Sequence, residues 1–368
     1  MALQTSGAIS LQDIQDEFGG SHPISLSEYY RGGGEVGSSN TNVPTSGQIS
    51  LSQFYGATDV VFYTIDYLIV AGGGGGSANG YSDYSNAGGG AGGMESHSAT
   101  ISDGQAMAVT VGGGGAGLTG VHPCHSHVAG NGSNSSFNGH TASGGGGAGF
   151  YRNGNNGGSG GGGNKQSCYT NQQKYYSPQI GYGGSGVSGE GNDGGDGYTH
   201  RQEPEYDDYG YLTHYNWYPW STAGGGGGKG SAGRLSDTRG NNQTSYSVVT
   251  DDYGYAIYPV GDPRYYHYDY RPSDWGDGAG SSWHGQGTFA EGGKATYSTP
   301  PNNDRAANSG SGGHGQFGWS GSFRGGTGGS GVVIIRYAGG QRGSGGNSIY
   351  SSGGYTYHKF TSSGTYNS

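Results

Sequence analysis

The chain has 368 residues, of which 88 are glycine, and a formal net charge of −10 at pH 7. Hydrophobic residues account for 30% and charged residues for 11% of the chain, so a conventional apolar core must be small. With 11 prolines and no Gly-X-Y register, the chain is not a collagen. The negative charge argues against nucleic acid as a partner, and the lack of a long apolar run argues against membrane insertion.

Residues 1–58 contain three related modules. Ser6 to Leu11 is echoed by Ser46 to Leu51, and Pro23 to Tyr30 is a looser copy. Each Ile-Ser-Leu run predicts a short strand followed by a single helical turn that a serine caps. The modules are too small to be stable alone, so we expect them to pack on each other or on a partner. The apolar residues expected to be buried in this way are Leu11, Ile14, Phe18, Leu26, Leu51 and Phe54.

From residue 59 onward, short apolar strands alternate with glycine runs. The strands are expected at residues 66–71, 106–111 and 332–337, and the main glycine runs are at 72–76, 112–115, 144–147, 160–163 and 224–228. Glycine runs usually form flexible linkers, but a linker needs no flanking strands. We therefore expect packed polyglycine II helices, which have three residues per turn and pair their backbone groups with neighbouring helices. The predicted fold is mainly β and irregular, with short antiparallel strands framing a polyglycine II sandwich, long aromatic-rich loops and very little α-helix.

Two insertions rich in tyrosine and tryptophan interrupt the glycine, at residues 199–221 and 245–275. Aromatic side chains offer a large contact area with few rotatable bonds, and antibody binding loops use the same composition. The insertions are therefore candidates for recognition, although the aromatic side chains could instead pack on each other as a local core. The candidate receptor-binding residues are Tyr209, Tyr211, Trp217, Trp220, Tyr253, Tyr255, Tyr266, Tyr268 and Trp275, with Asp207, Asp208, Asp251 and Asp252 as hydrogen-bond acceptors.

No motif indicates catalysis, and we expect neither enzyme activity nor a cofactor nor a metal site. The adjacent aspartates of the two insertions do not set a fixed separation between two carboxyl groups, as hydrolysis of a glycan requires. Residues 122–127 are rich in histidine, but their spacing fits no zinc pattern, which favours an exposed loop. Cys124 and Cys168 are compatible with one disulfide or with two thiols. Residues 191–197 resemble one calcium-binding repeat, which works only in stacked copies, so we favour a glycine segment with polar side chains.

The opening motif at residues 66–76 (Asp-Tyr-Leu-Ile-Val-Ala and five glycines) pairs with a closing motif at residues 328–337 (Gly-Gly-Ser-Gly-Val-Val-Ile-Ile-Arg-Tyr). Together they resemble the glycine-rich domain of bacteriophage tail-fibre and adhesin proteins, over residues 60–338. The N-terminal modules are similar to segments of structural proteins of marine phages, especially cyanophages. The resemblance implies a sandwich of polyglycine helices with variable receptor-binding loops at its tips.

The C-terminal segment departs from this family order. In relatives a segment like residues 352–365 precedes the first strand, whereas here it comes last. The alternation of residues 355–360 suits a pleated strand. We predict that residues 353–366 form a strand beside residues 60–71, in the same chain or in a neighbouring one, because exposed strand edges favour such pairing.

These observations predict a phage virion structural protein of the tail-fibre or adhesin type that binds a glycan or an outer-membrane protein on the host cell. The alternative is a purely structural component, such as a fibre shaft, a head decoration or a self-assembling filament. Residues 1–58 would attach to other proteins of the tail, fibre or baseplate, residues 59–338 would form the glycine-rich domain, and residues 339–368 would add a Gly/Ser stretch and a terminal strand. We expect synthesis in the host cytoplasm, assembly at the tail of the virion, and a homo-oligomer, with a trimer favoured.

Overall fold

The structure, a computed structural model, describes residues 2–37, 39–79, 86–119, 126–164, 179–206, 212–221, 223–233, 278–295, 304–317 and 324–368. The helical elements are α1 (Leu11–Phe18), η1 (Leu26–Glu28) and η2 (Leu51–Phe54). The strands are β1 (Phe62–Val70), β2 (Ala78–Asn79), β3 (Met94–Ser102), β4 (Ala106–Thr110), β5 (His127–Val128), β6 (Ser135–Phe137), β7 (His140–Ala142), β8 (Gly149–Phe150), β9 (Gln179–Gly181), β10 (Gly197–Tyr206), β11 (Leu212–Ser221), β12 (Ser281–Ser282), β13 (Thr288–Phe289), β14 (Gln316–Phe317), β15 (Val332–Ala338), β16 (Ser348–Ser352), β17 (Tyr355–Phe360) and β18 (Gly364–Asn367).

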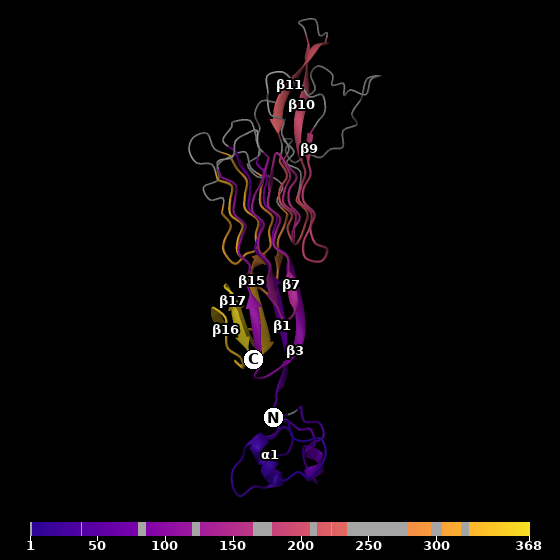
Figure 1. The fold of residues 1–368 in the computed structure, drawn as a ribbon, viewed down its shortest axis with the longest axis vertical. Helices are drawn as coiled ribbons and strands as arrows, with labels where there is room; N and C mark the ends of the chain where they lie inside the picture. Colours follow the sequence, from indigo (N-terminus) through magenta and orange to yellow (C-terminus); the bar gives the residue numbers. More distant parts are fainter. Residues whose placement is uncertain are drawn as a thin grey trace, which may run out of the picture.

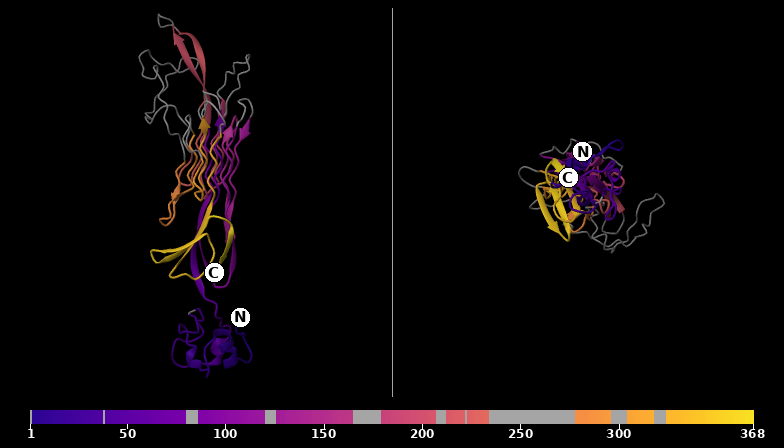
Figure 2. Two further views of the ribbon diagram at one scale, coloured as in Figure 1. Left: turned by 90° about the vertical axis from the view of Figure 1, so that its left-hand side faces the viewer. Right: turned by 90° about the horizontal axis from the view of Figure 1, so that it is seen from below.

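The protein is elongated, and its parts follow one another along the long axis (Figure 1). A small unit that contains α1 forms one end, the strands β1, β3, β15 and β17 lie next to it, and wavy glycine segments continue the axis. The strands β9, β10 and β11 lie at the opposite end. Figure 2 shows the same order from a second side, so the separation of the two ends does not depend on the view.

The N-terminal unit (residues 2–58) has an apolar core of its own. Ile14 and Phe18 of α1 are buried against Phe54 of η2 and against Tyr29, and the rings of Phe18 and Tyr29 each lie 6.3 Å from that of Phe54. Val36 and other small apolar side chains complete this core. The three modules therefore pack on each other, as one of the two sequence alternatives predicted.

Serine caps begin the helical turns of this unit. Ser10 forms a capping box with Asp13 at the start of α1, and Ser50 forms one with Gln53 at the start of η2. The strand predicted before each turn is wrong, because residues 5–10 and 46–50 adopt no strand. Among the described residues, no strand lies beside residues 5–10 or 46–50 to pair with their backbone, so only the capped turn forms.

Two antiparallel sheets form a sandwich between the N-terminal unit and the glycine segments. Their strand orders are β16-β17-β15-β1-β3 and β18-β4-β6-β7. Ile65, Tyr67 and Ile69 of β1 belong to the core between the sheets, where the ring of Tyr67 lies 5.0 Å from that of Phe137 in β6. The alternate residues of β1 face the opposite side, where Trp283 helps to cover them. From Tyr67 to Val70 both faces of β1 are buried, which is why this half of the strand is a continuous apolar run.

The C-terminal residues belong to this sandwich in the same chain. β17 helps to complete the sheet of β1 in the same chain, as predicted, but β15 lies between the two strands, so the predicted position directly beside residues 60–71 is wrong. The predicted single strand is also divided: β17 ends at Phe360, and β18 pairs with β4 in the second sheet. The turn between β17 and β18 carries the chain from one sheet to the other, which lets Phe360 and Tyr366 enter the same core.

The glycine segments are held together by backbone hydrogen bonds that repeat every three residues. Along residues 71–77, the N–H groups donate in turn to three different segments, with nitrogen–oxygen distances of 2.8–3.0 Å. The N–H groups of Ala71, Gly74 and Ser77 donate to the carbonyl oxygens of Gly93, Gly90 and Ala87, respectively. Those of Gly72 and Gly75 donate to Ser133 and Gly130, and those of Gly73 and Gly76 donate to Gly329 and Gly326. A β-strand repeats every two residues, whereas this repeat is the one that a helix with three residues per turn requires. The polyglycine II assignment itself stays a prediction.

The same pattern surrounds an interior segment on all sides. The N–H groups of residues 88–93 donate to residues 224–227, 310–313 and 143–146. Their carbonyl oxygens accept from Ala71 and Gly74, from Ser159 and Gly162, and from Gly293. Such close packing explains why glycine predominates, because a side chain would occupy the space of a neighbouring backbone.

The described part of the chain contains one α-helix of 8 residues, so the mainly β fold class with very little α-helix is confirmed. None of the helices in the described ranges has the length and apolar composition that crossing a bilayer requires.

His358 of β17 is a buried histidine whose hydrogen bonds fix it in the neutral form. Its Nδ1 donates to the carbonyl oxygen of Gly345 at 2.9 Å, and its Nε2 accepts from the Tyr337 hydroxyl at 2.9 Å. That hydroxyl in turn accepts from the backbone N–H groups of Arg342 and Gly343. A proton on Nε2 would face a hydroxyl that already accepts two hydrogen bonds. Burial lowers the pKa of His358 below its usual value.

We expect the sandwich to lose stability as the pH falls below about 6.5, the pKa of histidine in an unfolded chain. Below that pH the unfolded chain binds a proton at His358 that the folded chain does not bind. Neutral His358 therefore contributes fully to the free energy of unfolding above that pH, and this contribution is lost as the pH falls toward the lowered pKa of the folded state. One such proton corresponds to a slope of up to about 1.4 kcal/mol per pH unit. Urea unfolding between pH 7.5 and 5 should show a shallower slope for His358→Gln than for the native chain. Equal slopes would contradict this assignment.

Candidate functional site

The end of the molecule opposite the N-terminal unit is the candidate recognition site. β10 and β11 pair as an antiparallel hairpin, from Thr199↔Ser221 to Tyr206↔Leu212, and β9 pairs with the base of β10. Figure 1 shows this hairpin extending beyond the glycine segments along the long axis. Other glycine segments reach the same end of the molecule. The backbone N–H groups of Gln316 and Leu118 donate to the carbonyl oxygens of Ser77 and Gly76, at the end of the glycine segment that follows β1.

The first aromatic insertion is therefore a hairpin over most of its length, and the prediction of a loop is wrong for the residues in β10 and β11. The reason is visible in the sequence, because residues 212–221 are rich in the aromatic residues that favour strands. The register places Trp217 opposite Gln202. Trp220 also belongs to β11. The other candidate receptor-binding residues lie outside the described residues: Tyr209, Tyr211, Tyr253, Tyr255, Tyr266, Tyr268, Trp275, Asp207, Asp208, Asp251 and Asp252.

Polar side chains spaced three residues apart hydrogen-bond with the outer glycine segments. Asn131 and Asn134 accept from the N–H groups of Gly147 and Gly144, with oxygen–nitrogen distances of 2.9 and 2.8 Å. Two further pairs do the same: Asn153 and Asn156 accept from Tyr182 and Ser185, and Asp193 and Asp196 accept from Gly186 and Gly183. The spacing of three matches the backbone repeat, so each side chain takes the place of a missing neighbouring segment.

This role accounts for the polar residues within 191–197. The Oδ1 atoms of Asp193 and Asp196 point to backbone N–H groups at 2.8 Å, which agrees with the favoured interpretation of a glycine segment with polar side chains. Sequence reasoning missed the general rule. The signal was present as Asn or Asp at positions i and i+3 within glycine-rich sequence.

The residues predicted for attachment form the interior of the N-terminal unit rather than its surface. Ile14 and Phe54 are fully buried and Phe18 is 5% exposed. Leu26 and Leu51 pack around this core, and Leu11 is half-buried. These side chains stabilise the unit, so an attachment surface must use other residues that the unit presents.

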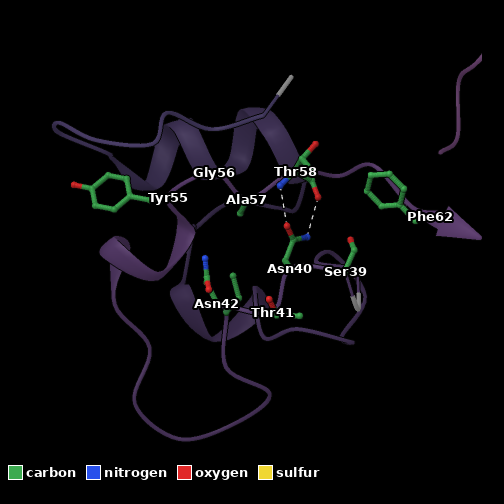
Figure 3. A pocket seen from close by; sticks show the side chains of 10 residues that line it. Ser39, Asn40, Thr41, Asn42, Tyr55, Gly56, Ala57, Thr58 and Phe62 are labelled. Carbon is green, nitrogen blue, oxygen red and sulfur yellow. Dashed lines mark hydrogen bonds between the residues drawn. The ribbon is translucent and has the colours of Figure 1, made fainter. Parts of the chain in front are cut away.

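A cavity of about 300 Å³ lies where the N-terminal unit meets β1 (Figure 3). Its polar lining comes mainly from Ser39, Thr41, Asn42 and the Asn40 side chain, and Phe62 is 55% exposed beside it. Asn40 is already paired: its Oδ1 accepts from the Thr58 N–H and its Nδ2 donates to the Thr58 carbonyl oxygen, both at 2.8 Å. None of the described residues that line the cavity carries a carboxylate, an amine or an imidazole. These side chains can hold a polar group by hydrogen bonds.

The opening and closing motifs of the glycine-rich region meet in the sandwich. β1 and β15 pair antiparallel, and Asp66 lies directly opposite Arg336. The Asp66 carboxylate accepts from Ser98 Oγ at 2.5 Å and from Arg336 at 3.0 and 3.2 Å, and these contacts, the hydrogen bond from Ser98 first, lower the pKa of Asp66. The Arg336 guanidinium also lies 4.4 Å from the ring of Tyr355 in β17.

Residues 51–338 match the family described as the glycine-rich domain. The chain belongs to this family.

The family match begins with η2 and ends with β15, so it includes the opening and closing strands and every glycine segment between them. β16, β17 and β18 follow the matched residues and complete the two sheets of this glycine-rich domain. No curated protein and no solved structure gave a significant match. Family membership therefore rests on the glycine-rich domain alone, and it assigns no partner or activity to the chain.

Proposed function

We propose that this protein is a phage virion structural protein of the tail-fibre or adhesin type, which binds a glycan or an outer-membrane protein on the host-cell surface. The observation that carries the proposal is the distance between its two specialised ends. The N-terminal unit lies at one end of an elongated molecule, and the hairpin of the first aromatic insertion lies at the other (Figure 1). An adhesin needs this arrangement, because one end must hold the particle while the other reaches the cell.

The glycine segments suit the role of a rigid support. Their N–H groups donate to several neighbouring segments in turn, so no segment can move without breaking bonds to others. Binding residues are commonly carried by loops or hairpins on such a scaffold, where the scaffold supplies position and the loop supplies the chemistry. Tyrosine and tryptophan at the far end would provide contact area, and aspartate would accept hydrogen bonds from sugar hydroxyls or contact a cationic partner.

The recognition half of the proposal is tested by adsorption of phage particles to host cells. Trp217 and Trp220 are replaced with alanine in one variant, and Tyr266 and Tyr268 in another. Truncating a residue that dominates binding costs about 2 kcal/mol or more, so adsorption should fall by at least about thirtyfold while the melting temperature is unchanged. Phe62→Ala is the matched control, because this exposed aromatic residue lies near the opposite end.

The outcomes separate recognition from local packing. Loss of melting temperature with a proportionate loss of adsorption would mean that the aromatic side chains form a local core. Unchanged adsorption in both double variants would contradict the adhesin proposal and favour the structural alternative of a shaft, a head decoration or a filament. Labelled antibody against residues 199–275 in electron micrographs gives an independent answer, since an adhesin displays these residues away from the virion.

The attachment half of the proposal assigns the N-terminal unit to contacts with other tail, fibre or baseplate proteins. This unit has a separate apolar core, so its removal leaves the cores of the sandwich intact. A chain without residues 1–58 should fold but should be missing from purified particles. Normal incorporation of the shortened chain would contradict the assignment. Light scattering of the native chain tests the accompanying expectation of a homo-oligomer, with a trimer favoured.

A further inference from the structure

Two histidines and a glutamate gather at one edge of the sandwich. Glu95 and His97 lie two residues apart on β3, so their side chains share a face of the strand. His140 begins β7, and β3 and β7 are the edge strands of the two different sheets. One potential ligand atom from each of these three side chains lies within 4.8 Å of the other two.

The contacts within this cluster are close. Glu95 Oε2 lies 3.0 Å from His97 Nε2. The imidazole rings of His97 and His140 stack, with centroids 3.7 Å apart and planes inclined by 23°. Beneath them lies the ring of Tyr67, whose centroid is 5.6 Å from that of His97 and 6.1 Å from that of His140. Glu95 and His97 are half-buried and His140 is exposed, so the cluster has an aromatic floor and an open side.

We propose that Glu95, His97 and His140 bind a divalent transition-metal ion of the zinc class, which joins the two sheets at this edge. Imidazole nitrogen and carboxylate oxygen are ligands that zinc accepts, whereas calcium and magnesium prefer oxygen ligands alone. Three protein ligands leave a fourth position of a tetrahedral ion open on the solvent side, where water can complete the coordination. The ion would thereby connect β3 to β7 without a backbone hydrogen bond between them.

The cluster needs a small adjustment to bind the ion. Bonds of about 2.0–2.1 Å in tetrahedral geometry place ligand atoms about 3.4 Å apart, whereas the three ligand atoms here lie within 4.8 Å of one another, so their spacing must adjust. The two stacked rings must also turn so that their lone pairs converge on one point. His140 is exposed and can rotate without disturbing the core, while His97 and Glu95 already lie at hydrogen-bonding distance.

The experiment uses the full native chain, freed of metal with a chelator and then titrated with Co²⁺ and Zn²⁺. Cobalt reports tetrahedral coordination through its visible absorption, and zinc should displace it. We expect His97→Gln and His140→Gln each to weaken Co²⁺ binding by about tenfold or more, since losing even an outer-shell partner of a metal ligand costs 10- to 100-fold. Zinc should also raise the melting temperature of the native chain, because an ion that binds the folded state stabilises it.

Two control variants separate this site from other histidines. His22→Gln changes an exposed histidine of the N-terminal unit and should leave the titration unchanged. His125→Gln changes the histidine-rich run at residues 122–127, which competes as a metal site in the sequence. Cobalt absorption that persists in His97→Gln and His140→Gln, or that disappears in His125→Gln alone, would overturn the proposal. Melting temperatures measured in chelator show whether each variant still folds, and Glu95→Gln supplies a third ligand variant of nearly equal volume.

Discussion

Replacing Gly74 with alanine is expected to destabilise the glycine-rich domain severely. The new Cβ would lie 2.2 Å from the carbonyl oxygen of Gly146, whereas ordinary contacts begin at 3.4 Å. The atom it meets is backbone, which cannot rotate away as a side chain can. Gly74 also donates to Gly90 and accepts from Gly313, so any displacement breaks hydrogen bonds on two further sides. Overpacking in a well-packed core typically costs about 1–3 kcal/mol, and we expect at least the upper end of this range.

Gly113→Ala is the matched control, because it makes the same chemical change in another glycine run. Apart from its two chain neighbours, no described residue has an atom within 4 Å of a Cβ built at Gly113, which is exposed. Alanine lowers the conformational entropy of the unfolded chain, so this variant should be unchanged or more stable by about 0.4–1 kcal/mol. Urea unfolding followed by circular dichroism measures both variants. Similar stabilities for Gly74→Ala and Gly113→Ala would show that the glycine segments are not closely packed in solution.

The comparison of these two glycines shows what the sequence leaves open. Gly74 and Gly113 both lie in glycine runs that directly follow a strand, and the sequence around them does not show which of the two is closely packed. The alternation of strands and glycine did predict an ordered scaffold, and the strands at residues 66–71 and 332–337 form as expected. The neighbours of each glycine segment could not be predicted, because backbone groups are chemically identical and a segment without side chains carries no record of its partners.

Contacts between side chains that are far apart in the sequence could not be predicted either. Ile14, Phe18 and Phe54 were recognised as residues to be buried, but spacing alone did not tell whether a partner or the chain itself would cover them. The cluster of Glu95, His97 and His140 was missed because its third member lies on another strand, and only the pairing of the sheets brings it near. The hairpin of β10 and β11 was not predicted, because its aromatic residues suit a binding loop as well as a strand, and composition alone does not separate the two.

Removing residues 353–368 is expected to prevent the sandwich from folding. The deletion takes away β17, which covers the edge of β15, and β18, which covers the edge of β4. It also removes Phe360 and Tyr366, two large side chains that lie 2% and 0% exposed in the core between the sheets. Losing one large buried aromatic side chain typically costs about 3–5 kcal/mol, and a whole domain is stable by only about 5–15 kcal/mol. The shortened chain should therefore be insoluble or unfolded.

Point variants of Tyr366 make this expectation quantitative. Tyr366→Phe removes only the hydroxyl, which lies 2.9 Å from the Tyr63 hydroxyl, and should cost about 1 kcal/mol if that hydrogen bond is lost. Tyr366→Ala leaves a cavity against Phe137 and His358, whose rings lie 6.3 and 5.1 Å from that of Tyr366, and should cost about 3–5 kcal/mol. The urea concentration at the unfolding midpoint should be highest for the native chain, lower for Tyr366→Phe and lowest for Tyr366→Ala. A chain ending at residue 352 that melts at the native temperature would mean that the C-terminal strands do not complete this core.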